Sequence, residues 1–395
     1  MTEHLDQQAP ATASFWRDPE KRARLFQVLV VVAVLALFGY IFQNTLHNLE
    51  KRGISTGFAF LDNEAGFGVL MSLIPYDETY TFGRTFLVGL LNTLLVSMIG
   101  VVFATLFGFI IGVARLSSNW IISRLAALYI EIFRNIPLLL QILFWYFAIL
   151  PLLPHPRQSI ALGGTVFLNK RGMYLPEPIT EPGFGWVAAA LGLAVVASMF
   201  IARWARRHQE VTGQTFPVFW TSLGLLVVLP WLAFGITGCP LSWEYPALRG
   251  FNFRGGITVI PELFALALAL SIYTAAYIAE IVRSGIQSVS HGQTEAAYAL
   301  GLKPGQALRL IIIPQAMRVI IPQLTSQYLN LTKNSSLAPA IAYPDLVALF
   351  AGTTLNQTGQ AVEIIGITMG VYLTLSLSIS GFMNWYNKRM ALVER

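Results

Sequence analysis

Charge and cysteine are both scarce in this sequence. Asp, Glu, Lys and Arg together make up only 12% of its 395 residues, about half of the share in a soluble domain. The single cysteine, Cys239, excludes an intrachain disulfide and a cysteine-rich metal site. The five histidines are scattered and have no partners at metal-ligand spacing, so we expect no resident metal.

Two motifs that would give the chain enzymatic chemistry are also missing. It has no Gly-x4-Gly-Lys-Ser/Thr phosphate loop and no His-Glu-x-x-His zinc motif. We therefore expect neither ATP binding by a phosphate loop nor a membrane-embedded metalloprotease. The interpretation is that this chain is not an enzyme and has no cofactor of its own.

Hydrophobic residues, in contrast, are abundant. They form 55% of the chain, and the mean hydropathy is +0.60. A helix needs about 20 apolar residues to cross the hydrocarbon core of a bilayer. The sequence predicts an all-α polytopic membrane protein with about eight spans: Leu25–Leu46, Phe86–Val113, Leu125–Leu153, Phe184–Ala202, Pro217–Gly238, Ile257–Ile281, Val319–Ala338 and Val362–Tyr386.

The first and seventh of these spans differ from the others in their flanking sequence and in their polarity. The first, 25–46, follows a polar tail, 1–24, and lacks the small-residue cleavage site of a signal peptide, so it is interpreted as a retained anchor. The seventh is unusually polar, and its alternative is a re-entrant or amphipathic segment. Its polar residues are Gln323, Gln327, Asn330, Lys333 and Asn334.

The distribution of basic residues predicts the orientation. With the N-terminus in the cytoplasm, the cytoplasmic segments hold 16 Lys and Arg residues and the outside segments hold 8. Because basic residues gather on the cytoplasmic side of membrane proteins, both termini are predicted to be cytoplasmic. The same rule explains the basic pI of about 9.4, so we expect no nucleic-acid partner.

A polar, turn-rich block interrupts the apolar pattern on the predicted cytoplasmic side, within 282–318. Ser290 and Gln293 have capping-box spacing at a helix start. Gly301 suits the left-handed position that closes a helix, and Pro304 suits the first turn of the next one. Pro314 is predicted to end or kink that second helix.

The first helix of this block presents a small apolar face. Ala296, Ala297 and Leu300 lie at helical spacing, with Glu295 beside them. Small side chains allow the surface of another protein to approach closely. The alternative from the residues alone is an ordinary amphipathic helix at the membrane interface.

The same block resembles the cytoplasmic loop of importer permeases in the ATP-binding-cassette (ABC) superfamily. The matching pattern is Glu295-Ala296-Ala297, then Gly301, then Ile311 and Pro314. The family usually has Leu before that proline, where this chain has Ile313. The resemblance implies the transmembrane domain of a type I ABC importer, with 282–318 as a coupling loop that docks on a separate ATPase subunit.

Four further stretches are similar to permeases for polar amino acids, and the long form resembles those of broad-range L-amino-acid importers. They are Gly89–Gly100, Glu131–Gln141, Ala275–Val289 and Leu331–Ala338. Within the second, Asn135 and Ile136 replace the usual Gly-Thr. The resemblance implies a permease domain over 86–386. Since smaller members have five spans, it also implies an added N-terminal span and an inserted two-span region at about 154–256.

The resemblance also implies the partners and the location. We expect a second, similar permease, two ATPase subunits that hold the ATP and Mg²⁺, a periplasmic amino-acid-binding protein and the bacterial inner membrane. Two alternatives remain open: an importer for opines or small peptides, and an ion-driven secondary transporter. The latter would show inverted repeats with broken helices, which the sequence does not reveal.

Ionisable residues inside the spans are candidates for a substrate pathway. A charge at the bilayer centre costs at least about 2.5 kcal/mol, so each should face protein or water. Glu131 and Arg134 lie three residues apart on one helix and could instead form a structural pair. The predicted pathway residues are Lys333, Asn334, Ser335, Asn330, Gln327, Glu131 and Glu280. The sequence does not predict which amino acids pass.

Overall fold

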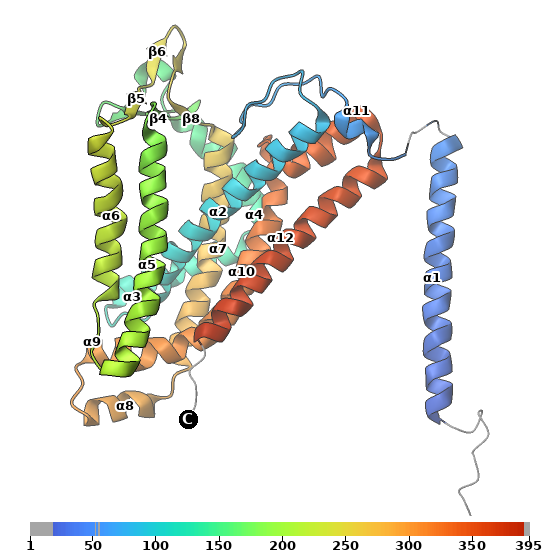
Figure 1. Ribbon diagram of the computed structural model, residues 1–395. Coiled ribbons are helices and arrows are strands. Elements are labelled where there is room, and N and C mark those ends of the chain that lie inside the picture. Colours follow the sequence, from blue (N-terminus) through green and yellow to red (C-terminus); the bar gives the residue numbers. More distant parts are fainter. Residues whose placement is uncertain (1–18, 52, 54–55, 391–395) are drawn as a thin grey trace, which may run out of the picture.

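The computed structural model describes residues 19–51, 53 and 56–390 (Figure 1). Seven helices in this part of the chain are long and apolar enough to cross a membrane, or eight if one bent pair counts as a single span. This confirms a mostly helical membrane protein with about eight spans. Most of the predicted tail 1–24 lies outside the described residues.

Three helices form the centre of the protein: α2 (Phe82–Arg115), α7 (Pro261–Gln287) and α10 (Ile313–Asn334). Small residues allow α2 and α7 to approach closely. A Cβ added at Gly108 would lie 2.5 Å from Ile278 Cγ2, and one at Gly112 would lie 2.7 Å from the carbonyl oxygen of Ala279. Small residues four apart are a common means of packing membrane helices.

The third predicted span is bent rather than straight. It consists of α3 (Trp120–Asn135) and α4 (Leu138–Phe144 with a helical continuation to Leu152), which meet at 103°. Pro137 causes the break, because the residue before a proline is driven to extended backbone, and Ile136 has φ −97° and ψ 127°. Gln141 Nε2 donates to the carbonyls of Phe133 and Ile136 at 3.0 and 2.9 Å.

Two further helices form a hairpin, α5 (Phe184–Thr212) and α6 (Val218–Ile236), which pack chiefly against each other. Figure 1 shows this hairpin beside the central helices and α1 (Pro19–Lys51) standing apart at the other side. The C-terminal helix α12 (Ala361–Met390) crosses the central helices obliquely, and its C-terminal end lies on the same side as α8 (His291–Ala299) (Figure 1).

Short strands cover the opposite end of the hairpin (Figure 1), where the sequence predicted only irregular loops. One four-stranded sheet has the order β1-β2-β3-β8, and β4-β5 and β6-β7 form two-stranded ribbons. The sixth predicted span accordingly starts too early, since Ile257–Val259 is β8. The strands are Ile160–Leu162, Val166–Asn169, Gly172–Leu175, Glu177–Thr180, Leu241–Glu244, Ala247–Arg249, Asn252–Arg254 and Ile257–Val259.

The remaining elements are short helical segments in the loops. The 3-10 segments are η2 (Ala59–Asp62), η4 (Leu150–Leu152), η5 (Pro156–Gln158) and η7 (Ser335–Ile341). The π-helical segments are η3 (Trp145–Ile149), η6 (Leu308–Ile312) and η8 (Val347–Thr354). Two single α-turns complete the fold, α9 (Pro304–Ala307) and α11 (Leu355–Thr358).

Candidate functional site

The polar block forms the predicted pair of short helices. Gly301 closes α8 in the left-handed conformation, with φ +77°. The following N–H, of Leu302, donates to the carbonyl of Ala297 at 3.1 Å, which satisfies one of the free carbonyls at the helix end. Pro304 occupies the first turn of α9. The turn chemistry predicted at both positions is therefore confirmed.

One other prediction about this block is wrong, and a second is wrong in part. The Ser290 side chain makes no capping hydrogen bond, and the Gln293 side chain instead accepts one from Gln315 Nε2 at 3.2 Å. Pro314 does not end the second helix, because helical backbone runs from Pro304 to Ile341, while the alternative, a kink at Pro314, stays a prediction. The π segment η6 lies just before Pro314, which places the proline in a first turn where its missing N–H is not needed.

The residues of the predicted apolar face of α8 do not all point the same way: one is buried and two are exposed. Ala297 is fully buried and anchors α8 to its own loop, whereas Leu300 is 80% exposed and Ala296 is also exposed. Glu295 Oε1 is 3.0 Å from His291 Nδ1, and both side chains are largely exposed. The outward surface thus combines an exposed leucine, an alanine and a carboxylate.

The second candidate region is a polar stripe on α10. Gln323, Ser326, Asn330 and Lys333 are exposed, and their spacing of three or four residues places them on one side of the helix. Gln327 and Asn334 are partly buried and lie at the edge of this stripe. Lipid would leave these polar groups unsatisfied, so the stripe requires water or another protein surface.

Ser335 does not share the stripe. It is fully buried, and its hydroxyl donates to the carbonyl of Thr332 at 2.7 Å. A side chain held in this way cannot contact a solute passing along the exposed side of α10. Ser335 instead belongs to the packing behind Lys333 and Asn334.

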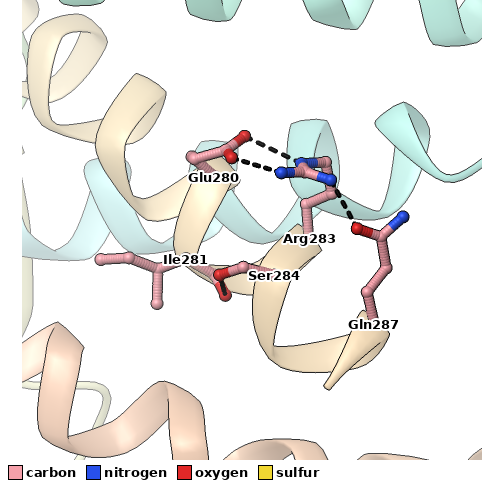
Figure 2. A network of polar contacts seen from close by, with 5 residues as sticks. All are labelled: Glu280, Ile281, Arg283, Ser284 and Gln287. Carbon is pink, nitrogen blue, oxygen red and sulfur yellow. Dashed lines mark hydrogen bonds and ion pairs between the residues drawn. The ribbon is translucent and has the colours of Figure 1, made fainter. Parts of the chain in front are cut away.

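Glu280 is held by a partner on its own helix (Figure 2). Arg283 Nε donates to Glu280 Oε2 at 2.9 Å, and Arg283 Nη2 donates to Glu280 Oε1. Arg283 Nη1 also donates to Gln287 Oε1. The bidentate contact neutralises Glu280 in place, so this carboxylate is a structural partner as well as a predicted pathway residue.

Glu131 and Arg134 do not form the structural pair that their spacing allows. Both are exposed, and no ion pair joins them in the described part of the chain. The Arg134 guanidinium instead lies 5.2 Å from the ring centre of Tyr277, whose hydroxyl donates to the Arg134 carbonyl at 3.3 Å. A cation over an aromatic face is attracted by the ring quadrupole, so Arg134 binds α3 to α7.

The sequence patterns did not predict a buried polar junction that involves Asn92, Thr93 and Asp345. All three side chains are fully buried, and they join α2 to the segment between η7 and η8. Two signals were present in the sequence: an asparagine inside an apolar span, and an aspartate inside the apolar stretch "YPDLVALF".

The chain is similar to characterised families over most of its length. Residues 211–392 match the family described as the inner membrane component of binding-protein-dependent transport systems. The putative amino-acid ABC transporter permease protein YhdX of Escherichia coli (strain K12) is 57% identical over 378 residues, with 96% of each chain covered.

Two further relatives are also named as permease proteins of amino-acid transport systems. The general L-amino acid transport system permease protein AapQ of Rhizobium johnstonii is 51% identical over 378 residues, covering 96% of this chain and 94% of that one. The glutamate/glutamine/aspartate/asparagine transport system permease protein BztB of Rhodobacter capsulatus is 42% identical over 409 residues, with 96% of each chain covered.

These similarities extend across both the polar block and the polar stripe of α10. At 96% coverage they also extend across the α5–α6 hairpin. The fold agrees with these similarities, because the chain is a mostly helical, multi-pass membrane protein. The chain belongs to the amino-acid ABC transporter permeases, a family of binding-protein-dependent transport systems.

Proposed function

We propose that this chain is the permease subunit of an ATP-driven, binding-protein-dependent importer that moves L-amino acids across a bacterial inner membrane. The observation that carries the proposal is the exposed polar stripe of α10, which ends in Lys333. Its position on a membrane span requires a partner surface or a watery path. The names of the relatives supply the substrate class.

Along this path, Lys333 is the cation for the carboxylate of an amino acid. An ammonium-to-carboxylate contact is stronger than a neutral hydrogen bond. Asn330, Gln327 and Asn334 offer amide donors and acceptors next to it. Glu131, which is not neutralised by Arg134, remains the acid available to a substrate ammonium group. Glu280 has its own partner, Arg283, and shapes the path rather than binding the solute.

The coupling loop is the docking surface for the ATPase subunits. The exposed Ala296 and Leu300 offer a shallow apolar contact, with Glu295 beside them. Helical backbone joins Pro304 to Lys333 over a length of about 44 Å at 1.5 Å per residue. A displacement of the docked loop by ATP binding would therefore reach the polar stripe through one continuous helix.

The cytoplasmic ends of the helices leave space for such a displacement. An apolar cavity of about 530 Å³ lies between the ends of α2 and α7 and the segment η6. Its lining includes Val113, Val282, Leu308 and Met317. Because η6 has a π-helical hydrogen-bond pattern, which often marks a functional site in a helix, we place the hinge of the coupling movement here.

The proposed assembly contains four other subunits or copies. A second, similar permease packs along the polar stripe, two ATPase subunits dock at the coupling loops, and a periplasmic binding protein delivers the substrate. The α5–α6 hairpin and α1 are additions to a smaller permease core of this family. Uptake requires the cavity to change its orientation. Ligand binding can drive this change only if the ligand makes better contacts in one orientation than in the other.

The first experiment is uptake of a labelled panel of L-amino acids, opines and small peptides in cells that lack this chain. We expect the loss of several unrelated L-amino acids and their rescue when the chain is restored. Loss of only opines or peptides would contradict the substrate assignment. Uptake that stops when the proton gradient is dissipated, with ATP maintained, would favour an ion-driven transporter instead.

Lys333→Ala tests the path itself. We expect uptake to fall to background while the assembled complex is recovered at the wild-type level, because the carboxylate loses its cation. The matched control is Lys170→Ala, at an exposed lysine next to His155 in the strand-rich outer segment, which should leave uptake unchanged. Normal uptake by Lys333→Ala would remove this residue from the path.

Gly301→Asp tests the coupling loop. A non-glycine residue at φ +77° costs about 1–2 kcal/mol of backbone strain, and the loop should lose its docking geometry. We expect ATP hydrolysis to continue without transport. Gly305→Asp places the same charge on helical backbone in the same loop and should retain coupling. Equal transport by both variants would contradict the role of the Gly301 turn.

A further inference from the structure

The segment between η7 and η8 is fastened tightly to α2. Asn92 Nδ2 donates to the carbonyls of Met71 and Pro344, both at 2.9 Å. The N–H of Leu346 donates to Thr93 Oγ1 at 3.0 Å, and the Tyr343 hydroxyl donates to the Asn92 carbonyl at 3.0 Å. Both sides of the contact therefore provide donors and acceptors.

The backbone on each side is adapted to this contact. Gly89 admits the segment, since an added Cβ would lie 2.9 Å from Leu346 Cα and 3.1 Å from the Asp345 carbonyl oxygen. Ala342 takes the left-handed conformation, with φ 58°, which costs a non-glycine residue about 1–2 kcal/mol. Such strain persists only where surrounding contacts fix the backbone.

Asp345 is the centre of this junction, and its two carboxylate oxygens differ. Oδ1 accepts from the N–H of Ala348, in the first turn of η8, at 2.8 Å. Oδ2 is buried and has no hydrogen-bond partner among the described residues. The whole side chain is fully buried, so this oxygen has no direct donor in the part of the chain that the structure describes.

The Tyr372 hydroxyl faces this carboxylate, and the hydroxyls of Ser335 and Thr93 lie near Tyr372. Tyr372 comes from α12 and interacts with Asp345, Ser335 and Thr93, although its hydroxyl makes a direct hydrogen bond to none of them. Ser335 begins η7 and Thr93 lies on α2. The junction thus joins four parts of the fold around one acidic group.

No described Lys or Arg forms an ion pair with Asp345. The titratable groups that face Asp345 are Tyr343, from its own segment, and Tyr372. The side chains that α2 and η7 contribute to the junction, Asn92, Thr93 and Ser335, are uncharged. Burial without a cation disfavours the charged form, and it raises the pKa of Asp345 to about 7.

We propose that Asp345 is a positioning residue that holds a proton on Oδ2, and that this protonated junction fixes the Lys333–Asn334 end of the polar stripe. The link is direct in the chain, because Ser335 in the junction follows Asn334 immediately. Only the expected effect on transport rests on the proposed function. The protonated junction itself is a property of the fold.

The direction of the pH effect follows from the raised pKa. The unfolded carboxyl titrates near its ordinary value of 3.8, whereas the folded one titrates near 7. Between these values the folded state binds more protons than the unfolded state, so stability falls as the pH rises. Above about pH 7 the junction contains an uncompensated buried carboxylate, and α10 loses a fixed end.

The test measures the melting temperature of the assembled, full-length complex in lipid nanodiscs from about pH 5 to about pH 8. We expect the wild type to lose several degrees over this range. Asp345→Asn retains an oxygen that can accept from the Ala348 N–H and, like the protonated acid, carries no charge, so its melting temperature should not vary with pH. Tyr372→Phe removes a group that lowers the pKa of Asp345, so the fall in melting temperature should extend to higher pH.

The matched control is Asp77→Asn, an exposed acid whose pKa is lowered by hydrogen bonds from Thr79. Its titration lies below the range tested, so this variant should retain the wild-type slope. A wild-type melting temperature that does not vary with pH, or an Asp345→Asn complex with the wild-type slope, would overturn the proposal.

Uptake into proteoliposomes provides the second measurement. We expect the wild-type rate to change several-fold between about pH 6 and about pH 8, and the Asp345→Asn rate to change less than about twofold. The same change in rate for both would contradict the positioning role. Absence of amino-acid uptake in every sample would instead bear on the proposed function, because the melting experiment needs no substrate.

Discussion

The central helices and the α5–α6 hairpin cross the membrane with similar composition but opposite packing. The most apolar windows of α5, α6 and α7 have mean hydropathies of 2.2, 1.9 and 1.8. Yet 67% of the α7 window is buried, compared with 6% for α5 and none of α6. Hydropathy therefore identifies a span without telling whether protein or lipid surrounds it.

The glycines of the two regions show the difference at atomic scale. In the core, a Cβ added at Gly108, Gly112 or Gly285 would lie within 3 Å of an atom on another helix. In the hairpin, a Cβ at Gly192 or Gly224 would meet nothing within 4 Å. A glycine in the core is required by close approach, whereas one in the hairpin only adds flexibility.

The largest expected effect is from Gly112→Leu. The new side chain would collide with the Ala279 carbonyl oxygen, 2.7 Å from an added Cβ, and backbone cannot yield as a side chain does. Overpacking of this kind costs about 3 kcal/mol, so α2 and α7 should separate. We expect little folded protein by size-exclusion chromatography after extraction in mild detergent.

The matched variant in the hairpin is Gly192→Leu. It adds the same side chain to a membrane helix, but into open space. We expect a wild-type elution profile and melting temperature. Equal damage by both substitutions would mean that the hairpin is packed against a protein surface in the assembly, and the contrast between the two regions would fail.

A smaller effect is expected from removing a buried polar group in each region. Asn92→Ala leaves the carbonyls of Met71 and Pro344 without their donor, at a cost of about 2 kcal/mol. Ser198→Ala on α5 removes a buried hydroxyl that has no hydrogen-bond partner among the described residues and should be neutral. The measurement is the melting temperature of each purified variant. A large loss with Ser198→Ala would show that this hydroxyl has a partner outside the chain.

The sequence predicted those features that are decided within a few residues. The 20-residue rule for membrane helices identified about eight spans, and the conformational preferences of Gly301 and Pro304 predicted the turn after α8. These predictions succeed because bilayer thickness and backbone sterics act on each segment separately. The pathway residues and the domain boundaries remain predictions.

The missed features depend on contacts between distant segments. Spacing alone suggested that Arg134 pairs with Glu131, but the ring of Tyr277 on another helix attracts it instead. Glu280 and Arg283 have the same spacing and do pair. The junction at Asp345 needs Thr93, which lies about 250 residues earlier in the chain. The local pattern of a single sequence does not identify neighbours that lie far apart along the chain.

The smallest effect is expected from excising the hairpin. Its two ends meet, because the N–H of Glu181 donates to the carbonyl of Pro240 at 3.1 Å, and Thr180 pairs with Leu241 between β4 and β5. Residues 181–240 can therefore be replaced by Asn-Gly, the two-residue turn that antiparallel strands favour. Removing two spans together keeps the orientation of all later ones.

We expect the excised chain to insert and to melt within a few degrees of the wild type. The core loses few packing contacts, since α5 and α6 pack chiefly against each other, and the cost should stay below about 1 kcal/mol. Removing α5 alone is the control. Deleting one span inverts the orientation of all the spans that follow it, so this variant should not fold. If both deletions abolish folding, the hairpin is part of the core's stability, and its exposed faces are covered in the assembly by protein rather than by lipid.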